Sequence, residues 1–126
     1  MNRKGLTLIE LLIVMVIVAI LAAISVPMYT GYMTRARRAD AKTALEQLRA
    51  AEEMRRAEYG AYSNDLAALQ TSWGAPATNQ RYYTISLAAT ATTFTGTATP
   101  TGSQTVDGAL TIDEDGDKQP ADKWLK

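Results

Sequence analysis

The side chains on which most enzymes and many metal sites depend are missing from this sequence. It contains neither cysteine nor histidine, which excludes disulfides, thiolate chemistry, a histidine base and any zinc site built on Cys or His. It also has no glycine-rich phosphate loop and no nucleophile paired with a base. We therefore expect no enzymatic activity. Two ionisable features remain, an isolated glutamate near the start and an acidic cluster near the end.

The isolated glutamate is Glu10, the only ionisable side chain between Leu6 and Thr34. Within this stretch, Leu11–Val26 reads LLIVMVIVAILAAISV, without a single charge. A helix of that length covers about 24 Å, and the longer stretch crosses the ~30 Å hydrocarbon core of a membrane. A carboxylate beside such a core is costly when it is unpaired, so it usually has a partner and a function. The alternative is a glutamate that snorkels to the membrane interface.

The acidic cluster lies in the segment DEDGD, where Asp113, Asp115 and Asp117 alternate. Oxygen-rich loops of this kind bind Ca²⁺ in other proteins, which makes these three residues the candidate calcium ligands. The EF-hand spacing fails, because Gly116 directly follows the second aspartate and Trp124 occupies the place of the final glutamate. We favour a solvated Asp-Gly turn, with no cofactor, and keep calcium as the alternative.

A basic cluster follows the apolar stretch. Such a cluster can contact the phosphates of lipid or DNA, but we expect a solvated face or an ion-pair partner for acidic residues of another subunit. The formal charge of the chain balances at 13 basic and 13 acidic residues, so nucleic acid is not expected as a specific ligand. The basic residues are Arg35, Arg37, Arg38 and Lys42, and the acidic partners considered are Glu52, Glu53 and Glu58.

One long helix is predicted to carry both the apolar stretch and the basic cluster. Pro27 and Gly31 can kink a helix without ending it, and the pairs Arg49–Glu53 and Glu52–Arg56 have the spacing of a solvated helix face. The predicted helix runs from Leu6 to Tyr59 and is roughly 80 Å long. Its second half is amphipathic, with apolar residues at three- and four-residue steps, namely Ala41, Ala44, Leu45, Leu48, Ala51 and Met54.

A small antiparallel sheet is predicted after the helix. Gly60 is the expected helix terminator, and Asn64-Asp65 is expected to cap a short turn at Leu66–Leu69. The residue period then changes to two, which indicates strands. The fold class is therefore α+β, with the long helix packed on about three or four strands. The predicted segments are a loop at Trp73–Gln80, strands at Tyr82–Ala88, Thr93–Thr99 and Ala109–Ile112, a turn at Pro100–Gly108 and a polar tail at Asp113–Lys126.

The N-terminus allows three interpretations. Arg3 and Lys4 before an apolar run are typical of a secretory signal peptide, with Ala22–Ser25 as a forced cleavage site. An ordinary membrane anchor explains the length of the run. Neither explains Glu10, and a leader of five residues is short for a signal peptide.

The third interpretation rests on residues 4–10, KGLTLIE, which resemble the processing site of type IV prepilins and pseudopilins. The resemblance implies cleavage between Gly5 and Leu6 by a membrane-embedded peptidase, N-methylation of Leu6, and an assembly role for Glu10 as the fifth residue after the cut. Pro27 matches the proline of the family's apolar helix. Residues 58–62 (EYGAY) and 108–113 (GALTID), with Trp124, are similar to the PilE-like subgroup of pilins.

Two departures from the family pattern are visible. Leu6 stands where phenylalanine is usual, and the C-terminal cysteine pair of many pilins is absent. The tail must then be held by packing and hydrogen bonds, or by a metal ion.

The resemblance implies a pilin-like fold and four regions: a leader at 1–5, a transmembrane or filament-core segment at 6–34, an amphipathic half-helix at 35–59 and a globular head at 60–126. It also implies that the protein is a structural subunit of a type IV pilus, with a role in adhesion, twitching motility or DNA uptake. The alternatives are a pseudopilin of a type II secretion system and a monomeric membrane-anchored binding module. The expected partners are identical or related pilin subunits, the prepilin peptidase, the inner-membrane assembly machinery and, before assembly, membrane lipid. The expected location is the inner membrane, then an extracellular pilus or a periplasmic pseudopilus.

Cleavage suggests how subunits join. It creates an α-amine at Leu6, and in hydrocarbon this cation and the Glu10 carboxylate are each costly alone but cheaper together. We therefore expect Glu10 of one subunit to pair with the Leu6 amine of its neighbour.

Overall fold

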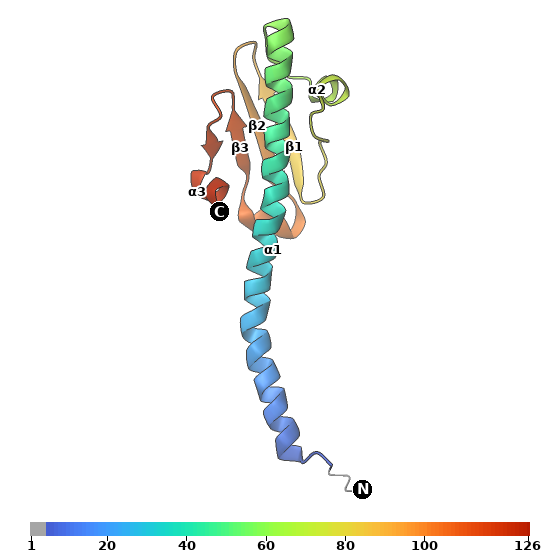
Figure 1. Ribbon diagram of the computed structural model, residues 1–126, viewed down its shortest axis with the longest axis vertical. Helices are drawn as coiled ribbons and strands as arrows, with labels where there is room; N and C mark the ends of the chain where they lie inside the picture. Colours follow the sequence, from blue (N-terminus) through green and yellow to red (C-terminus); the bar gives the residue numbers. More distant parts are fainter. Residues whose placement is uncertain (1–4) are drawn as a thin grey trace. The chain divides into compact units, whose positions relative to one another are not determined.

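The computed structural model describes residues 5–126, so Arg3 and Lys4 of the predicted leader lie outside the described residues. The chain divides into two compact units at the bond between Met33 and Thr34. We call residues 34–126 the head unit and describe each unit by itself. Figure 1 shows the helices and strands in sequence colours.

Helix α1 (Leu8–Tyr59) is continuous over 52 residues and contains Pro27. It begins two residues later than predicted, because Thr7 forms its N-terminal cap. It ends as expected before Gly60, whose φ of 78° is one that glycine adopts without strain. The Gly60 amide closes the last turn by donating to the carbonyl of Arg56, at 2.7 Å.

The head unit contains a four-stranded antiparallel sheet in the order β1-β2-β3-β4, and residues 34–59 of α1 lie along it (Figure 1). The α+β fold predicted from the sequence is confirmed. Three strands begin one residue later than predicted, and the two-residue β4 lies in the segment predicted as a polar tail. The strands are β1 (Tyr83–Ala89), β2 (Phe94–Pro100), β3 (Leu110–Asp113) and β4 (Lys118–Gln119).

The core lies between α1 and one face of this sheet. The amphipathic half of α1 buries the stripe that its three- and four-residue spacing predicted, except that Met54 stays exposed. Gly96 of β2 marks the closest approach, because a Cβ there would lie 2.7 Å from Cδ2 of Leu48. Only glycine therefore lets the strand approach the helix this closely. The core comprises Ala41, Ala44, Leu45, Leu48 and Ala51 of α1, with Leu69, Ala75, Tyr83, Ile85, Ala98, Leu110 and Ile112.

Short helices fill the connections. The predicted turn after Asp65 is a full helix, α2 (Leu66–Trp73), with Asp65 accepting from the Ala68 amide at 3.1 Å and Gly74 as the C-terminal cap. It extends past Leu69 because that side chain is completely buried and Trp73 packs edge-on against Tyr59, with ring centroids 6.3 Å apart.

The predicted turn at 100–108 contains a 3-10 helix, η1 (Gly102–Asp107), and the predicted tail contains α3 (Ala121–Leu125). Both were missed because their stabilising contacts are to distant residues, which no local pattern reveals. Gln104 and Asp107 of η1 are buried. The tail of the chain is attached to α1 through Lys42, as described below.

Candidate assembly segment and the polar anchor of the head

Glu10 belongs to a capping box at the start of α1. The Thr7 amide and the Thr7 hydroxyl each donate to Oε2 of Glu10, and the Glu10 amide donates to Oγ1 of Thr7, all at 3.2 Å. This is the reciprocal pattern of a threonine N-cap with a glutamate three residues later. The spacing Thr-x-x-Glu was readable in the sequence, but Thr7 was not recognised there as a partner of Glu10. Both bonds end on Oε2, so the second carboxylate oxygen, Oε1, can accept from another donor.

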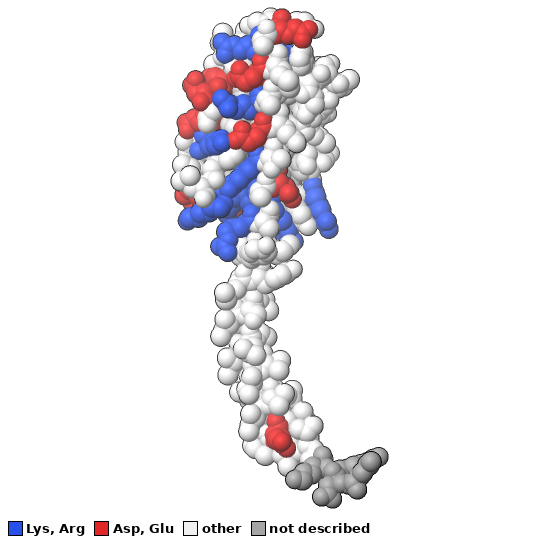
Figure 2. Space-filling view, viewed as in Figure 1, with Lys and Arg blue, Asp and Glu red and all other residues white. Residues whose placement is uncertain are grey.

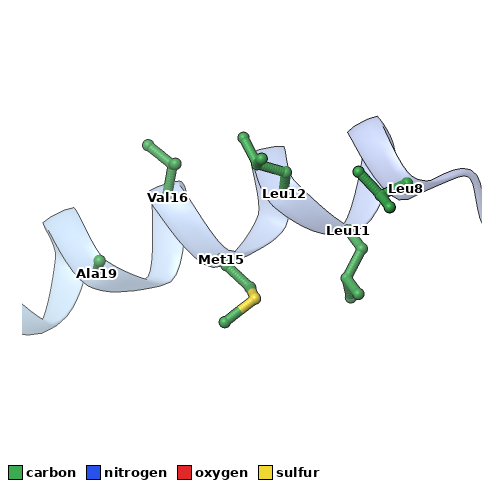
Figure 3. Close-up of a pocket in the computed structure, with 6 residues that line it drawn as sticks. All are labelled: Leu8, Leu11, Leu12, Met15, Val16 and Ala19. Atoms are coloured by element: carbon green, nitrogen blue, oxygen red, sulfur yellow. The ribbon is translucent and has the colours of Figure 1, made fainter.

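The apolar part of α1 presents side chains all around the helix. Every residue from Leu8 to Thr30 is exposed in the structure, and α1 contains a stretch long and apolar enough to cross a membrane, although a signal sequence near the N-terminus has the same properties. Figure 3 shows one stripe of this surface, with Leu12 and Val16 along one edge of the stripe and Leu11 and Met15 along the other. Together with Leu8 and Ala19 they line a shallow open groove on the helix surface. In water this arrangement is unfavourable, so another apolar phase must cover it.

Gly5 and Leu6 precede the first helical residue and are exposed. The peptide bond between them therefore lies in a non-helical segment that an enzyme can reach. Pro27 lies inside α1, and its carbonyl accepts from the Thr30 hydroxyl at 2.9 Å. The roles of Gly5 and Leu6 in processing, of Glu10 in assembly and of Pro27 as a kink stay predictions.

The acidic cluster forms a turn whose acceptor is Asp113. Its Oδ1 accepts from the amides of Asp115 and Asp117, at 3.1 and 2.8 Å. Gly116, with φ of 79°, completes the turn. Oδ1 of Asp117 accepts from the Lys118 amide at 3.1 Å. These bonds account for an Asp-Gly turn without an ion. Over residues 5–126, no group of three acidic side chains is placed to hold a metal, and calcium binding by Asp113, Asp115 and Asp117 stays untested.

The basic cluster is not uniformly solvated, which corrects the expectation from the sequence. Arg38 is buried and forms a two-point ion pair with Asp107 of η1, in which Nε donates to Oδ2 at 2.8 Å and Nη2 donates to Oδ1. Arg38 is thus unavailable to acidic residues of another subunit. No local pattern indicates this pairing, because the two residues are 69 positions apart in the sequence.

This ion pair belongs to a buried network around Tyr83. The Tyr83 hydroxyl donates to Oδ2 of Asp107 at 3.1 Å and accepts from Nε2 of Gln104 at 2.9 Å. Nε2 of Gln104 also donates to the Thr34 carbonyl of α1, at 2.9 Å. Residues from α1, β1 and η1 therefore meet in one set of hydrogen bonds, which fixes the 3-10 segment against the helix.

The network shifts the pKa values of its members. Burial alone would raise the pKa of Asp107, but the hydrogen bond and charge of Arg38 outweigh it and hold that pKa below its usual value. The same hydrogen bond raises the pKa of Arg38. Burial raises the pKa of Tyr83 to about 12. The ion pair is thus fully charged at neutral pH, and Tyr83 keeps its proton.

Glu52 also departs from its expected place on a solvated helix face. Its side chain is completely buried, and Oε2 accepts from the Ser63 amide at 3.0 Å, while Oε1 has no hydrogen-bond partner among the described residues. Burial raises its pKa, and the Ser63 bond opposes the rise. Neither pair predicted for the solvated face, Arg49–Glu53 or Glu52–Arg56, forms a salt bridge in the described part of the chain. Glu52 instead ties the segment after Gly60 to the last turns of α1.

Two family models together match residues 1–111 of the chain. The model described as "Type IV minor pilin ComP, DNA uptake sequence receptor" matches residues 27–111, more than half of the chain. The model of the prokaryotic N-terminal methylation motif matches residues 1–26. The chain belongs to the type IV pilin family.

Curated pilins resemble part of this pilin. The type IV major pilin protein PilA of Myxococcus xanthus is 40% identical over 63 residues, which are 50% of this chain and 29% of that protein. A fimbrial protein of Moraxella nonliquefaciens is 49% identical over 47 residues, 37% of this chain and 30% of that protein. The chain thus spans about a third of the length of the curated relatives that it matches.

Solved pilin structures resemble the fold. A type IV pilin from Shewanella oneidensis has a TM-score of 0.58 at 27% identity, covering 70% of this chain and 92% of that one. The minor pilin PilV of Neisseria meningitidis has a TM-score of 0.55 at 20% identity, covering 69% and 85%, and supports the fold alone.

The tail of this pilin is held without cysteines. Nζ of Lys42 on α1 donates to the carbonyls of Trp124 and Lys126, at 3.0 and 2.7 Å. Nε1 of Trp124 donates to the Gln119 carbonyl at 3.3 Å. Lys118 forms a salt bridge of 2.5 Å with Glu46 of α1. The tail is therefore attached to the helix by packing and hydrogen bonds, which is one of the two alternatives considered from the sequence.

Proposed function

We propose that this pilin is a structural subunit of a type IV pilus and assembles by packing its N-terminal helix against the helices of neighbouring copies. The observation that carries the proposal is that every residue from Leu8 to Thr30 is exposed. Its large apolar side chains need cover, first from lipid and then from other subunits. Among the described residues of this unit the only charged side chain is Glu10, and Figure 2 shows the surface of this part of the helix as almost entirely white.

N-terminal processing prepares the subunit for assembly. A prepilin peptidase cuts between Gly5 and Leu6, and the new amine of Leu6 is methylated. The accessible, non-helical position of this bond supports the proposal. The cut leaves the capping box intact, because Thr7 and Glu10 both stay in the mature chain. The start of α1 is therefore defined before and after processing.

Glu10 sets the position of a new subunit. Its Oε2 caps its own helix through Thr7, and Oε1 accepts from the Leu6 amine of a neighbour already in the filament. An ion pair in an apolar environment forms only where both partners meet, since either charge alone is costly there. Helix packing supplies the driving force and the ion pair supplies the register.

The partners and locations follow from this assembly. The subunit waits in the inner membrane, the assembly machinery transfers it, and identical or related subunits receive it in an extracellular filament. Adhesion, twitching motility and DNA uptake are the candidate roles. The description of the matching family model names a DNA uptake sequence receptor, which makes DNA uptake the role to test first. The balanced charge of the chain, in contrast, predicts no specific nucleic-acid ligand.

N-terminal mass spectrometry and assembly assays test the proposal together. The mature chain should begin at a methylated Leu6, and sheared cells should yield fibres that contain it. Glu10→Ala should be processed normally but should assemble poorly, whereas Glu10→Asp should retain part of the assembly. Normal fibre yield from processed Glu10→Ala would exclude the pairing role of Glu10.

Two alternatives have different signatures. A pseudopilin of a type II secretion system would be processed but would form no surface fibres, and its loss would block secretion. A monomeric membrane-anchored binding module would keep its leader. An uncut N-terminus on a monomeric chain would overturn the pilus proposal.

A further inference from the structure

Basic side chains from three separate segments gather at one end of the head unit. Figure 2 shows them as a blue zone at the end where α1 enters the head, while red groups predominate toward the other end. We call this set the basic collar. It consists of Arg35, Arg37 and Lys42 of α1, Arg81 before β1, and Lys123 and Lys126 at the end of the chain.

Specific contacts hold the collar together. The guanidinium of Arg37 lies 4.2 Å from the ring centre of Tyr82, and that of Arg81 lies 5.3 Å from the same ring. Nη1 of Arg37 also donates to the Ser103 hydroxyl at 3.3 Å. Tyr82 therefore keeps two cations side by side that would otherwise repel each other.

The tail joins the collar through α1. Lys42 binds the carbonyl of Lys126 at 2.7 Å. Nζ of Lys123 lies beside Gly108, where an added Cβ would be 2.9 Å from it. Lys123 also contributes to holding the pKa of Asp107 down. The last residues of the chain thus carry two further cations to the end of the head where η1 meets α1.

Few acidic groups oppose the collar. Asp107 is already paired with Arg38 inside the head. Asp122 lies next to Lys123 on α3, and Asp40 lies beside Arg81 in a groove between α1 and the segment before β1. Both are exposed. The collar therefore presents a net positive surface even though the whole chain is balanced.

We propose that the basic collar binds the phosphates of anionic phospholipids while the apolar part of α1 spans the membrane. Arg35 follows Thr34, the end of the apolar stretch, within one continuous helix. At about 1.5 Å per residue, it enters the headgroup region as soon as the stretch fills the hydrocarbon core. Basic groups beside a membrane span attract anionic lipid, and the attraction adds over several cations. This inference rests on the proposed membrane-inserted precursor.

Membrane insertion favours lipid over nucleic acid as the partner. An anionic bilayer surface repels duplex DNA, whereas lipid phosphates are already present beside Arg35 at high local concentration. The collar would hold the membrane-inserted subunit against the bilayer surface. Its attraction to anionic lipid would oppose extraction of the subunit from the membrane. With the leader on the cytoplasmic side, Arg35 and Arg37 lie on the outer side of the membrane. The rule that basic residues stay in the cytoplasm does not account for this position, whereas binding to anionic lipid does.

Energy transfer in nanodiscs tests the proposal with the full chain. The sequence has no cysteine, so Val106→Cys, at a side chain that is 83% exposed on η1, gives a single site for a donor dye. The acceptor is a lipid labelled on its headgroup. Transfer is compared between neutral phosphatidylcholine discs and discs containing phosphatidylglycerol. The test variant is Arg35→Gln/Arg81→Gln, and the matched control is Arg55→Gln/Arg56→Gln, which removes the same charge near the last turn of α1, away from the collar and the tail.

The expected result is a rise in transfer when anionic lipid is present, and its loss at about 1 M salt, where the Debye length falls to about 3 Å. The rise should disappear in the test variant and persist in the control. An unchanged transfer in the two lipids, or a rise that persists in the test variant, overturns the inference. If the test variant loses affinity for a short DNA duplex while lipid charge does not change the energy transfer, the collar binds nucleic acid instead. Failure to insert into neutral discs contradicts the proposed function, whereas insertion without a response to lipid charge contradicts only this inference.

Discussion

Arg38 on α1 and Asp107 on η1 form a two-point ion pair inside the head unit, with side chains that are 9% and 4% exposed. Tyr83 and Gln104 extend the pair into a network that reaches the backbone of Thr34. These polar contacts attach the segment 102–107 to the helix.

Removing one member of this pair should destabilise the head strongly. Arg38→Met leaves a buried carboxylate without its partner, and we expect a loss of about 3 kcal/mol or more in the free energy of unfolding. Urea unfolding of the full chain in detergent measures it. The double variant Arg38→Met/Asp107→Leu should recover much of the loss, because no unpaired charge remains. Additive losses in the double variant would show that the two residues do not act as a pair.

The same pair should make the head sensitive to acid. Arg38 holds the pKa of Asp107 below its usual value, so the folded state binds that proton less readily than the unfolded state. The stabilisation is present above the unfolded pKa of about 4 and is lost as the pH falls through the lower folded value. Unfolding measured from pH 7 to pH 2 should show this loss, and Asp107→Asn should have a flatter acid limb from a lower starting stability.

Glu52 should have the opposite pH dependence. Burial raises its pKa, so the folded state binds this proton more readily, and its contribution to stability improves as the pH falls from neutral toward the unfolded pKa of about 4. Glu52→Gln should retain the acceptor for the Ser63 amide and remove this pH dependence. We expect the variant to be at least as stable as the parent at pH 7. A large loss at pH 7 would mean that the charge itself is needed.

Gly96 should tolerate no side chain. A methyl group there would lie 2.7 Å from Cδ2 of Leu48, which is completely buried and cannot swing away. Gly96→Ala should therefore cost about 1–3 kcal/mol of stability through overpacking. Thr95→Ala, at an exposed position of the same strand, is the control and should change the unfolding midpoint little. Equal effects of the two changes would contradict the close approach of β2 to α1.

Asp113 should stabilise the acidic loop whether or not calcium is present. Its Oδ1 binds two amides of the loop, so Asp113→Ala should lower the melting temperature by the same amount in a chelator and in millimolar calcium. Asp115→Ala, which removes no such acceptor, is the control. A stabilisation of the parent by calcium that both variants abolish would instead establish the metal site considered from the sequence.

The sequence predicted the parts of the fold that depend on local periodicity. The apolar spacing in α1, the stop at Gly60 and the alternation in β1 and β2 each involve neighbours within a few residues, and the structure reproduces them to within about two positions. Asn64-Asp65 likewise predicted the cap of α2, although not that burial of Leu69 and packing of Trp73 would lengthen the helix.

The polar anchor could not be predicted in the same way. Arg38 meets Asp107, and Lys42 meets Trp124, only after the chain has returned to α1 from far along the sequence. Glu52 was assigned to the solvated face because the four-residue spacing to Arg56 suggested a surface pair, whereas the path of Ser63 places an amide over its carboxylate. Thr7 was the one missed residue with a local signal, because Thr-x-x-Glu before an apolar run is a known start of a helix.

The two edge strands of the sheet determine whether neighbouring copies can pair through their backbones. Beside β1, the Ile85 amide is taken by the Thr78 carbonyl at 2.7 Å, and the Ala89 amide by the Asn64 side chain at 3.1 Å. On the other side β4 is two residues long and is followed by Pro120, which has no amide hydrogen to offer. Neither edge strand offers a strand from another copy a continuous row of free backbone donors and acceptors. Tightly massed copies are therefore protected from fusing into amyloid-like ribbons, and contacts between them must form through side chains.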